Sequence, residues 1–519
     1  MRITILETSD IHGHMFPYLA DKSDRIKQGI SYIYRYVQQS RKEEEHVLLI
    51  DNGDVIQGSP FMLYHVKNES DHPNPIIQLL NETRYDAAVV GNHEFNFGLD
   101  FFKKAMSESK FPWLSCNILD EKTNEPTFGQ PYIIKKFGEI KVVVLGATTH
   151  FIPNWEDPHH IEGLLFEDAV QSLKKWVPSI QQAEKPDLFI VSYHGGFERD
   201  IHTGEAIEEE TGENQAYKIC QEINGIDILL TGHQHQQMAS QINGVHIIQP
   251  GFNGQGIGKV TVEFTKRNNR WEVEEMNSQV VQWDDVTPDE SILQSVRPFE
   301  ERTHKWLDKI IARSNGGLEI HDTFQARLKE HPYVEFINKI QMHATGAPIS
   351  CTALFNNAAK GFSQSITIRD VVTNYIYPNT LKVLEVTGED IKEALERCAT
   401  YFDLRNDEII VNRQFSEPKP QHFNYDMWEG IDYTIDLTQK TGNRVISVTY
   451  NGEPLQKDHL YHVVMNNYRA SGGGGYTMFQ NKRVVIEMQR DMTELIIEYL
   501  EQNKWIEATV NENWRILKG

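Results

Sequence analysis

Five short apolar runs in the first half of the chain are each followed at once by a polar motif. The runs cover residues 3–6, 47–50, 87–90, 188–191 and 228–230. Short, uninterrupted apolar runs of this kind are typical of buried strands. Strands of a largely parallel sheet end on the same edge, so the motifs that follow them are expected to lie together on one edge of a central sheet.

Further segments of the same region alternate between strand-like and helix-like patterns. Strands are expected at residues 142–145, 245–248 and 259–264, and helices at residues 30–39 and 167–176. This alternation predicts a layered α/β domain for residues 1–285, with the polar motifs along one rim. Periodicity alone does not separate a sandwich of two sheets from one doubly wound sheet.

The pattern changes after residue 285. Thr287-Pro288-Asp289-Glu290 resembles a helix start, and an amphipathic segment then runs to Arg313, ahead of Asn315-Gly316-Gly317. We therefore expect a connector helix within residues 286–317.

A second domain is expected over residues 318–519, because a chain of 519 residues is too long for one core. Its pattern mixes helices at residues 333–343 and 391–401 with strands at residues 381–386 and 460–464. Asn451-Gly452, between two strand-like runs, is a strong signal for a hairpin.

The polar motifs are rich in side chains that bind metal ions. They are Asp10-Ile11-His12, Gly53-Asp54, Gly91-Asn92-His93-Glu94, His194-Gly195-Gly196 and Gly232-His233-Gln234-His235. One such motif is weak evidence, since a lone histidine after a strand is usually structural, but five in one series indicate a site. Carboxylate, imidazole and amide donors without cysteine suit manganese, iron, cobalt or zinc, and argue against a closed structural zinc site.

This series of motifs resembles that of the calcineurin-like metallophosphoesterases. Together with features of the second domain, the chain resembles the 5′-nucleotidase and 2′,3′-cyclic-nucleotide 2′-phosphodiesterase family over nearly its whole length. The resemblance implies a two-sheet sandwich flanked by helices, joined by the connector helix to a C-terminal α/β nucleotide-binding domain.

The resemblance also implies two divalent metal ions, of which manganese is favoured and zinc, cobalt and iron are alternatives. One ion would be held by Asp10, His12, Asp54 and His235. The other would be held by Asp54, Asn92, His194 and His233. Two cations roughly 3.5–4 Å apart need a shared anion, and Asp54 is the carboxylate placed to bridge them.

The expected reaction is in-line attack at phosphorus by a hydroxide held between the ions. His93 is not a ligand in this scheme, and is expected to stabilise the transition state and protonate the departing oxygen. Asn96 stands three residues after His93, where the 5′-nucleotidase branch typically has aspartate. An amide can orient an imidazole but adds no charge, and this form resembles the cyclic-phosphodiesterase branch.

Two loops of the second domain resemble nucleoside-binding segments of the family. On residues 423–430 the stacking ring is Phe423 or Tyr425, and on residues 466–475 it is Tyr468. Trp428 is as well explained as a core residue.

Family members that act on free 5′-nucleotides resemble one another in a segment whose arginines bind the nucleotide. The corresponding segment here is residues 354–358, which contain Asn356 and Asn357 but no arginine. Arg369 and Arg469 are the nearest basic candidates, and each is equally explained by a structural ion pair. The absence of arginine from this segment weakens the interpretation of the chain as a plain 5′-nucleotidase.

The composition of the chain limits the kinds of partner that it can bind. The formal net charge of −23 argues against a nucleic-acid polymer and leaves a small nucleotide or cyclic nucleotide as the substrate. No apolar stretch is long enough to span a membrane, and neither a leader nor an anchor is recognised. The four cysteines lack paired spacing and are expected to be buried thiols, so a cytoplasmic location is expected. Nothing indicates an oligomer.

We therefore expect an enzyme that hydrolyses 2′,3′-cyclic nucleotides and 3′-nucleotides in nucleotide catabolism. A 5′-nucleotidase or UDP-sugar hydrolase is the alternative within enzymes. A catalytically inactive nucleotide- or metal-binding protein is the alternative from another class.

Overall fold

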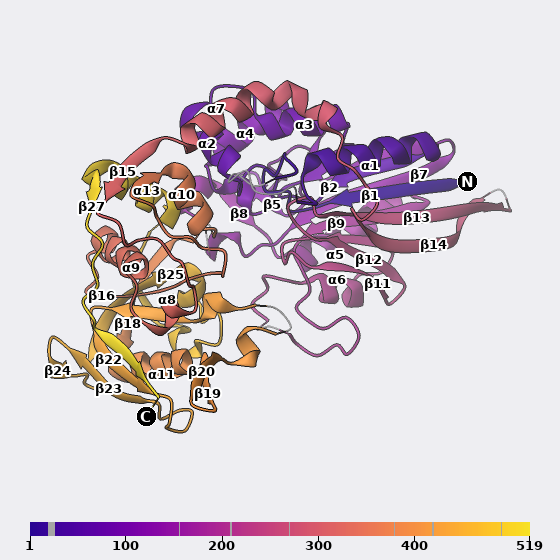
Figure 1. Ribbon diagram of the computed structural model, residues 1–519. Helices are drawn as coiled ribbons and strands as arrows, with labels where there is room; N and C mark the ends of the chain where they lie inside the picture. The colour runs from indigo at the N-terminus through magenta and orange to yellow at the C-terminus, as the bar shows by residue number, and fades with distance from the viewer. Residues whose placement is uncertain are drawn as a thin grey trace. The chain divides into compact units, whose positions relative to one another are not determined.

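The chain forms two compact units, Met1–Thr303 and His304–Gly519, in the computed structural model shown in Figure 1. The structure describes residues 1–18, 26–154, 156–207, 210–268, 270–377, 379–417, 420–488 and 490–518. Each unit has its own sheets and helices, as two separate cores require.

The first sheet of the N-terminal unit has the strand order β14-β13-β1-β2-β3-β4. Its strands are β1 (Arg2–Thr8), β2 (Val47–Asp51), β3 (Ala87–Val89), β4 (Trp113–Leu114), β13 (Gly256–Arg267) and β14 (Arg270–Gln282). Strands β1 to β4 are parallel, whereas β13 runs antiparallel to β1. The predicted strands at the first three motifs are confirmed.

A second sheet has the order β11-β12-β10-β9-β7-β6. Its strands are β6 (Tyr132–Phe137), β7 (Ile140–Thr148), β9 (Leu188–His194), β10 (Ile228–Thr231), β11 (Gln237–Ile242) and β12 (Val245–Pro250). The expectation of one central sheet is therefore wrong, because β1, β2 and β3 belong to one sheet and β9 and β10 to the other. The two-sheet sandwich implied by the family resemblance is the observed architecture.

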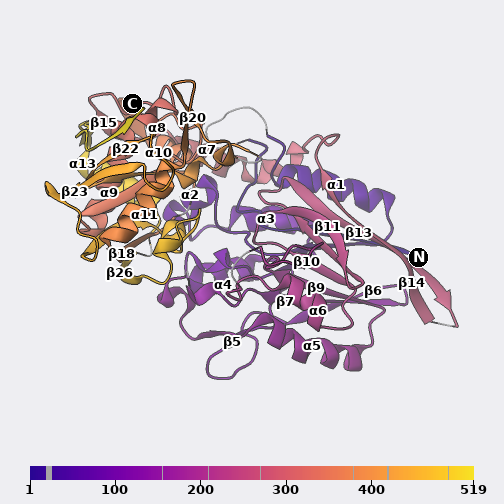
Figure 2. The same ribbon diagram turned by 90° about the horizontal axis from the view of Figure 1, so that it is seen from below.

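Alternate residues of the strands enter two different cores. On β7, Val142 and Val144 pack with Ile5 and Leu48 of the first sheet. Val143 and Leu145 instead join a cluster on the other face, which includes Leu173 of α5 (Ala169–Glu184) and Ile219 of α6 (Ala216–Glu222). Figure 2 shows both helices on the outer side of this sheet. Strands covered on both faces explain the unbroken apolar runs of the sequence.

Short elements complete this unit. They are α1 (Ile30–Glu43), α2 (Pro60–Asn68), α3 (Pro75–Thr83), α4 (Leu99–Glu108), the pair β5 (Ile118–Asp120) and β8 (Leu164–Phe166), and the 3₁₀ segments η1 (His93–Phe95), η2 (Ile152–Asn154), η3 (Pro158–Ile161) and η4 (Glu290–Val296). Predicted helices at residues 30–39 and 167–176 correspond to α1 and α5.

The predicted connector helix is only partly right. Helix α7 (Arg297–Leu307) follows η4 but ends six residues short of Arg313. Residues Ile310–Ser314 form strand β15, paired with β17 (Ser365–Thr367) and β27 (Trp505–Ile506). Pairing with segments distant in sequence overrides the local amphipathic pattern.

The C-terminal unit is built on a five-stranded sheet of order β21-β16-β25-β18-β26. The strands are β16 (Ile349–Ala353), β18 (Leu381–Thr387), β21 (Asp426–Glu429), β25 (Leu460–Asn466) and β26 (Arg483–Glu487). A second sheet contains β22 (Asp432–Asp436), β23 (Val445–Tyr450), β24 (Glu453–Pro454) and β28 (Trp514–Leu517). The remaining elements are α8 (Gln325–Leu328), α9 (Pro332–Thr345), α10 (Ile368–Asn374), α11 (Gly388–Ala399), α12 (Asn467–Ala470), α13 (Met492–Asn503), the pair β19 (Phe402–Arg405) and β20 (Glu408–Val411), and the 3₁₀ segments η5 (Arg413–Phe415), η6 (His422–Asn424) and η7 (Thr477–Phe479).

The hairpin predicted at Asn451-Gly452 is confirmed. Strands β23 and β24 pair through Tyr450 and Glu453, which leaves a two-residue turn. Asn451 and Gly452 have φ angles of 52° and 80°, the left-handed conformation that such a turn requires.

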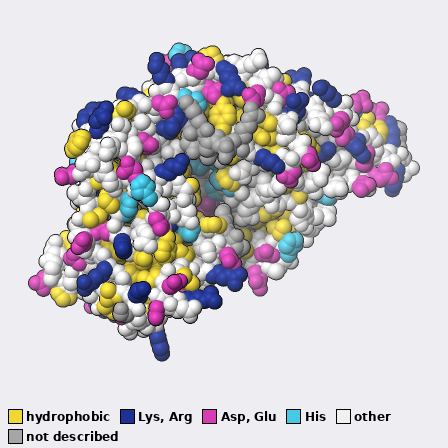
Figure 3. Space-filling view, in the orientation of Figure 1, with side chains coloured by type: hydrophobic (Ala, Val, Ile, Leu, Met, Phe, Trp, Pro, Cys, Tyr) yellow, Lys and Arg dark blue, Asp and Glu magenta, His cyan; other side chains and the backbone are white. Residues whose placement is uncertain are grey.

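The surface carries charges of both signs. On the face seen in Figure 3, Lys and Arg side chains lie among Asp and Glu side chains, with many of both at the end formed by β13 and β14. The described part of this face shows no continuous basic patch of the kind that tracks a nucleic-acid backbone. Among the described residues, no helix combines the length and apolar character needed to cross a bilayer.

Candidate metal centre

The polar motifs form tight turns at the ends of their strands. Five of the candidate ligands have positive φ angles: Asp10 (53°), His12 (49°), Asp54 (60°), His233 (69°) and His235 (59°). This left-handed conformation is unfavourable for residues other than glycine and clusters at functional sites, where the surrounding structure holds it. The turns therefore store strain in order to direct these side chains inward.

One group of donors comprises Asp10, His12 and His235. The Nε2 atoms of the two histidines lie 3.0 Å apart. The Nε2 atom of His235 lies 3.4 Å from Asp10 Oδ1, and that of His12 lies 3.9 Å from it. Asp10 is fully buried, so its carboxylate can reach only partners inside the site.

A second group comprises Asp54, His194 and His233, with Asn92 beside them. The Nε2 atom of His194 lies 3.2 Å from Asp54 Oδ2. The side-chain oxygen of Asn92 lies 3.1 Å from His194 Nε2 and 2.9 Å from His233 Nδ1. These are the donors that the sequence assigned to the second ion.

The other nitrogen of three of these rings is held by an acceptor outside the cluster. His12 Nδ1 lies 3.1 Å from the Gln57 carbonyl oxygen, and His194 Nδ1 lies 2.7 Å from the Asn52 carbonyl oxygen. His233 Nε2 lies 2.9 Å from Glu213 Oε1. Each acceptor fixes a proton on that nitrogen and leaves a lone pair on the nitrogen that faces the cluster. Converging lone pairs fit divalent cations.

The charges within the cluster also favour the binding of cations. Burial lowers the pKa of His12 to about 3, which keeps its imidazole neutral and able to ligate. Burial would also lower the pKa of His194, but the neighbouring Asp54 and Asp10 carboxylates outweigh it and raise this pKa to about 10. The two carboxylates thus favour positive charge at the position of His194, where a cation would bind.

Glu94 ties the two neighbouring motifs together, a role that the sequence analysis missed. Its carboxylate accepts from the backbone N–H groups of Gly91 (2.7 Å), Asp54 (2.9 Å) and Val55 (2.7 Å). Burial, followed by the charge of Asp54, raises the pKa of Glu94 to about 7. Its place directly after His93 was the available signal.

His93 lies beside the second group. Its backbone N–H donates to Asp54 Oδ1 at 2.8 Å, and its ring Nε2 lies 4.0 Å from Asp54 Oδ2. Its Nδ1 is 2.5 Å from Asn96 Oδ1, as expected for an amide that orients the ring.

The predicted stacking rings on the aromatic loops of the C-terminal unit differ in their exposure. Tyr468 is 42% exposed and Phe423 is half-buried, and their ring centroids lie 6.2 Å apart at an interplanar angle of 69°. Tyr425 is fully buried, stacked on Tyr401 at 4.6 Å, so this structure leaves it no free face for a base and removes it as the stacking candidate. Trp428 is also a core residue.

A third accessible ring, absent from the sequence analysis, lies next to Phe423. Tyr377 is 38% exposed, with its centroid 6.1 Å from that of Phe423 and 5.2 Å from that of Phe355. Tyr377 stands two residues after Tyr375 in the segment that follows α10, and nothing in the sequence signalled this grouping.

The segment of residues 354–358 is held from beneath by Arg327. This buried guanidinium donates to the Leu354 carbonyl (2.7 Å), the Asn356 carbonyl (3.1 Å) and the Asn357 side chain (2.8 Å). Asn357 also meets His422 Nε2 at 3.0 Å, and Asn356 Oδ1 accepts from the Ala358 N–H at 2.8 Å. The amide of Asn357 is therefore engaged by Arg327 and His422, which lie outside this loop.

Both arginines named as basic candidates make structural ion pairs. Arg369 Nε lies 2.7 Å from Asp308 Oδ1. Arg469 is fully buried and bonds both oxygens of Asp426, at 2.5 and 3.2 Å.

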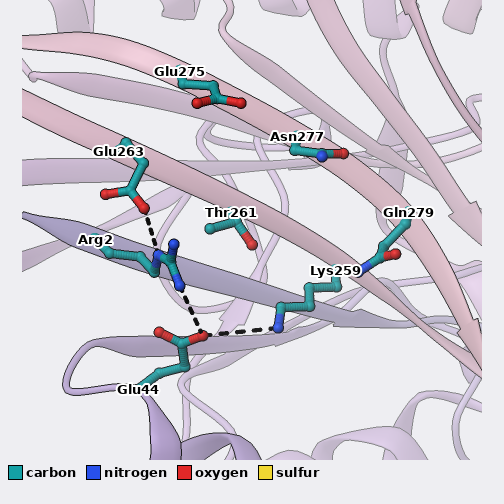
Figure 4. Close-up of a pocket in the computed structure, with 8 residues that line it drawn as sticks. All are labelled: Arg2, Glu44, Lys259, Thr261, Glu263, Glu275, Asn277 and Gln279. Atoms are coloured by element: carbon teal, nitrogen blue, oxygen red, sulfur yellow. Dashed lines mark hydrogen bonds and ion pairs between the residues drawn. The ribbon is translucent and has the colours of Figure 1, made fainter.

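A shallow depression of about 230 Å³ lies on the first sheet, away from the candidate ligands. It is lined by Arg2, Glu44, Lys259, Thr261, Glu263, Glu275, Asn277 and Gln279 (Figure 4). Arg2 bonds Glu263 at 2.5 Å, and Glu44 lies within 4 Å of both Arg2 and Lys259. Arg2 opens β1, whereas the metal candidates follow its other end, so this depression is a surface ion-pair network.

Two adjacent groups of metal donors, with a histidine beside them at the strand ends of an α/β sandwich, define a two-metal phosphoesterase site. Comparison with known proteins agrees. Residues 3–237 match the model of the calcineurin-like phosphoesterases, and residues 310–481 match that of the 5′-nucleotidase C-terminal domain. The chain belongs to this family of metal-dependent phosphoester hydrolases, the calcineurin-like phosphoesterases that carry a 5′-nucleotidase C-terminal domain.

Individual relatives include more than one activity. A solved Staphylococcus aureus structure, described as a candidate 5′-nucleotidase in complex with alpha-ketoglutarate, is 35% identical and covers all of both chains with a TM-score of 0.83. A 2′,3′-cyclic-nucleotide 2′-phosphodiesterase/3′-nucleotidase of Salmonella typhimurium is 26% identical over 91% of this chain and 81% of its own. The trifunctional nucleotide phosphoesterase protein YfkN of Bacillus subtilis is 25% identical over 99% of this chain, which spans 39% of that relative.

Proposed function

We propose that this protein hydrolyses 2′,3′-cyclic nucleotides and 3′-nucleotides with two bound divalent ions. The observation that carries the proposal is the convergence of two donor groups, with His93 Nε2 4.0 Å from Asp54 Oδ2 at their edge. Nucleotide hydrolysis is common to the named relatives, whereas the preferred ester is the step that we add.

The proposed ligands are those of the two donor groups. Asp10, His12 and His235 would hold one ion, Asn92, His194 and His233 would hold the other, and Asp54 would serve both. When bound, divalent ions would supply a water of lowered pKa and would offset the negative charge on the phosphoryl group, with manganese favoured and zinc, cobalt or iron as alternatives. The turns hold their donors at positive φ angles, and the histidine rings are fixed in one tautomer, so the protein side of this site is preorganised.

His93 is proposed to serve the leaving group. A water oxygen forms the new bond to phosphorus, the bond from phosphorus to the ribose 2′-oxygen breaks, and that oxygen takes a proton. His93 Nε2 faces the site, so it is placed to hold this proton at the departing oxygen.

Preference for the cyclic ester rests on two features. Asn96 brings no charge of its own to His93, as in the cyclic-phosphodiesterase branch that the motif resembles. Among the described residues, the loop of residues 354–358 offers no arginine for a 5′-phosphate, because Arg327 lies beneath it and is occupied by backbone carbonyls. A 5′-nucleotidase or UDP-sugar hydrolase remains the alternative, supported by the 5′-nucleotidase names among relatives.

Nucleoside recognition is assigned to Phe423 and Tyr468, with Asn356 and Asn357 on a neighbouring loop of the same unit. A base between two rings needs parallel faces about 7–8 Å apart, two contact distances. The observed angle of 69° and centroid distance of 6.2 Å mean that one ring must rotate and the two rings must move apart when a base enters. The four free, buried cysteines support the cytosol as the proposed compartment.

The deciding experiment compares specificity constants for 2′,3′-cyclic AMP, 3′-AMP and AMP with Mn(II), beside a chelated sample. The proposal expects the cyclic ester and 3′-AMP to be preferred over AMP, with activity lost on chelation and restored by Mn(II). A higher specificity constant for AMP would place the chain among the 5′-nucleotidases. Nucleotide affinity without turnover, unchanged in His93→Ala, would indicate a binding protein.

A further inference from the structure

A chain of hydrogen bonds continues behind His93 and reaches a second loop of the N-terminal unit. His93 Nδ1 is 2.5 Å from Asn96 Oδ1, and Asn96 Nδ2 donates to Glu156 Oε2 at 2.7 Å. The other carboxylate oxygen, Glu156 Oε1, lies 2.9 Å from His160 Nδ1. The amide at position 96 is therefore backed by a full negative charge, supplied 60 residues further along the chain.

The loop that carries Glu156 and His160 is held in place locally. The N–H of Glu156 donates to the Ile152 carbonyl at 3.0 Å, and Asp157 caps the short 3₁₀ segment η3 through the His159 N–H at 2.8 Å. This turn places His160 four residues after Glu156, on the same side. Only 8% of the Glu156 side chain is exposed, so water competes little for its carboxylate.

The carboxylate determines the direction of every bond in the chain. A carboxylate only accepts, so the Asn96 group that faces Glu156 must be its NH₂, and the group that faces His93 must be its carbonyl oxygen. An oxygen at this position requires a proton on His93 Nδ1. The remaining nitrogen, Nε2, is the one that faces Asp54.

Without Glu156 the amide of Asn96 loses this constraint. An amide turned by half a rotation would present NH₂ to Nδ1, and a donor there excludes an imidazole protonated on both nitrogens. Such a ring could not hold a proton at Nε2 for the leaving oxygen and keep its Nδ1 bond. Orientation of one amide therefore decides whether His93 can assist departure.

We propose that Glu156, seated by His160, is a positioning residue for the reaction: acting through Asn96, it fixes His93 with Nε2 toward the leaving oxygen. The pair replaces, across two loops, the carboxylate that the 5′-nucleotidase branch typically has three residues after its histidine. The inference rests on the proposed phosphoester hydrolysis and adds two residues that the sequence motifs do not contain. Its consequence is a dependence on the leaving group, since a weakly basic leaving group departs without a proton.

The test measures kcat and KM with Mn(II) on 2′,3′-cyclic AMP, whose ribose oxygen leaves poorly, and on bis-p-nitrophenyl phosphate, whose phenolate leaves well. Glu156→Gln keeps the shape but removes the charge, and is expected to lower kcat for cyclic AMP by about 100-fold with little change in KM. The same variant should lose less than about 3-fold on the phenyl ester, which also shows that it is folded and binds metal. His159 is exposed on the same turn, and His159→Gln is the matched control. This variant should leave kcat and KM unchanged for both substrates.

A charge swap separates positioning from loop stability. Asn96→Asp alone sets two carboxylates against each other at a 2.7 Å contact and should lower kcat for cyclic AMP at least as much as Glu156→Gln. The double variant Asn96→Asp/Glu156→Gln restores one carboxylate and one amide in reversed order, and should recover to within about 5-fold of the wild type.

Two results would overturn the inference: equal losses of Glu156→Gln on both substrates, or a double variant no better than the worse single variant. Wild-type protein that hydrolyses neither ester with Mn(II) would instead refute the proposed function itself. The two failures are therefore distinguishable.

Discussion

Replacing Arg469 by methionine should destabilise the C-terminal unit by about 3–5 kcal/mol, the cost of leaving one member of a buried ion pair without its partner. The Arg469 guanidinium bonds both oxygens of Asp426, donates to the carbonyls of Phe423 (2.9 Å) and Gly473, and lies 3.8 Å from the ring centre of Tyr476. Both charged side chains are 1% exposed. Solvent therefore cannot rehydrate the stranded carboxylate.

Calorimetry can assign the effect to the correct unit. Mn(II) is expected to raise only the unfolding transition of the N-terminal unit, since bound ligand stabilises the unit that holds it. For a unit of this size, 3–5 kcal/mol corresponds to a decrease of roughly 10 °C in the metal-insensitive transition. The double variant Arg469→Met/Asp426→Leu removes both charges and should return to within about 1 kcal/mol of the wild type.

A shift of that transition by less than about 2 °C in the single variant would contradict the prediction. A double variant that is less stable than the single variant would also contradict it. Either result would mean that the ion pair is not the element that holds the two aromatic loops together.

Three further predictions concern the metal turn, the pH dependence of stability and the base. An added Cβ at Gly91 would stand 2.6 Å from the Asp54 N and closer still to its carboxylate, so Gly91→Ala should lower kcat/KM about 100-fold and weaken Mn(II) binding in calorimetric titration. Burial, followed by Glu335, raises the pKa of Glu330 from 4.5 to about 7, so native protein holds a proton that unfolded chain releases, and stability falls as pH rises toward 7. Glu330→Gln should therefore stabilise the protein by about 1 kcal/mol at pH 8, since solvent screens this partly exposed group, and by less at pH 5 in urea unfolding, and no difference between the two pH values would contradict this. Phe423→Ala should raise KM for 2′,3′-cyclic AMP about 10-fold and leave bis-p-nitrophenyl phosphate unaffected, whereas equal changes would exclude base stacking.

Local features of the sequence were enough to locate the strands and the candidate donors. The apolar run of residues 188–191 is covered on both faces, and Leu48, Leu49 and Ile50 of the run 47–50 are all fully buried, which produces a continuous hydrophobic signal. Asn451-Gly452 specifies its turn through the backbone conformation of two residues. Because the motifs follow strand ends directly, their spacing already indicated that the donors would converge.

Long-range pairing was what the sequence could not supply. Assignment of β9 and β10 to a second sheet depends on which strands pair, and every strand concerned has the same apolar pattern. Strand β15 exists because of partners at residues 365–367 and 505–506, and its own residues fit a helix equally well. Glu156 carries no motif, since only the folded chain brings it to Asn96.

The donors of each proposed ion are divided between two stacked sheets, with Asp10 and Asp54 on one layer and His194, His233 and His235 on the other. Ions bound at these sites would thus link the two sheets, so that ion binding and the packing of the sheets against each other become linked equilibria. Loosening the shared interior, for example at Ile190 or Leu230, would then weaken ion affinity without touching a donor. In this architecture, the packing between the two sheets and the affinity for the cations therefore change together.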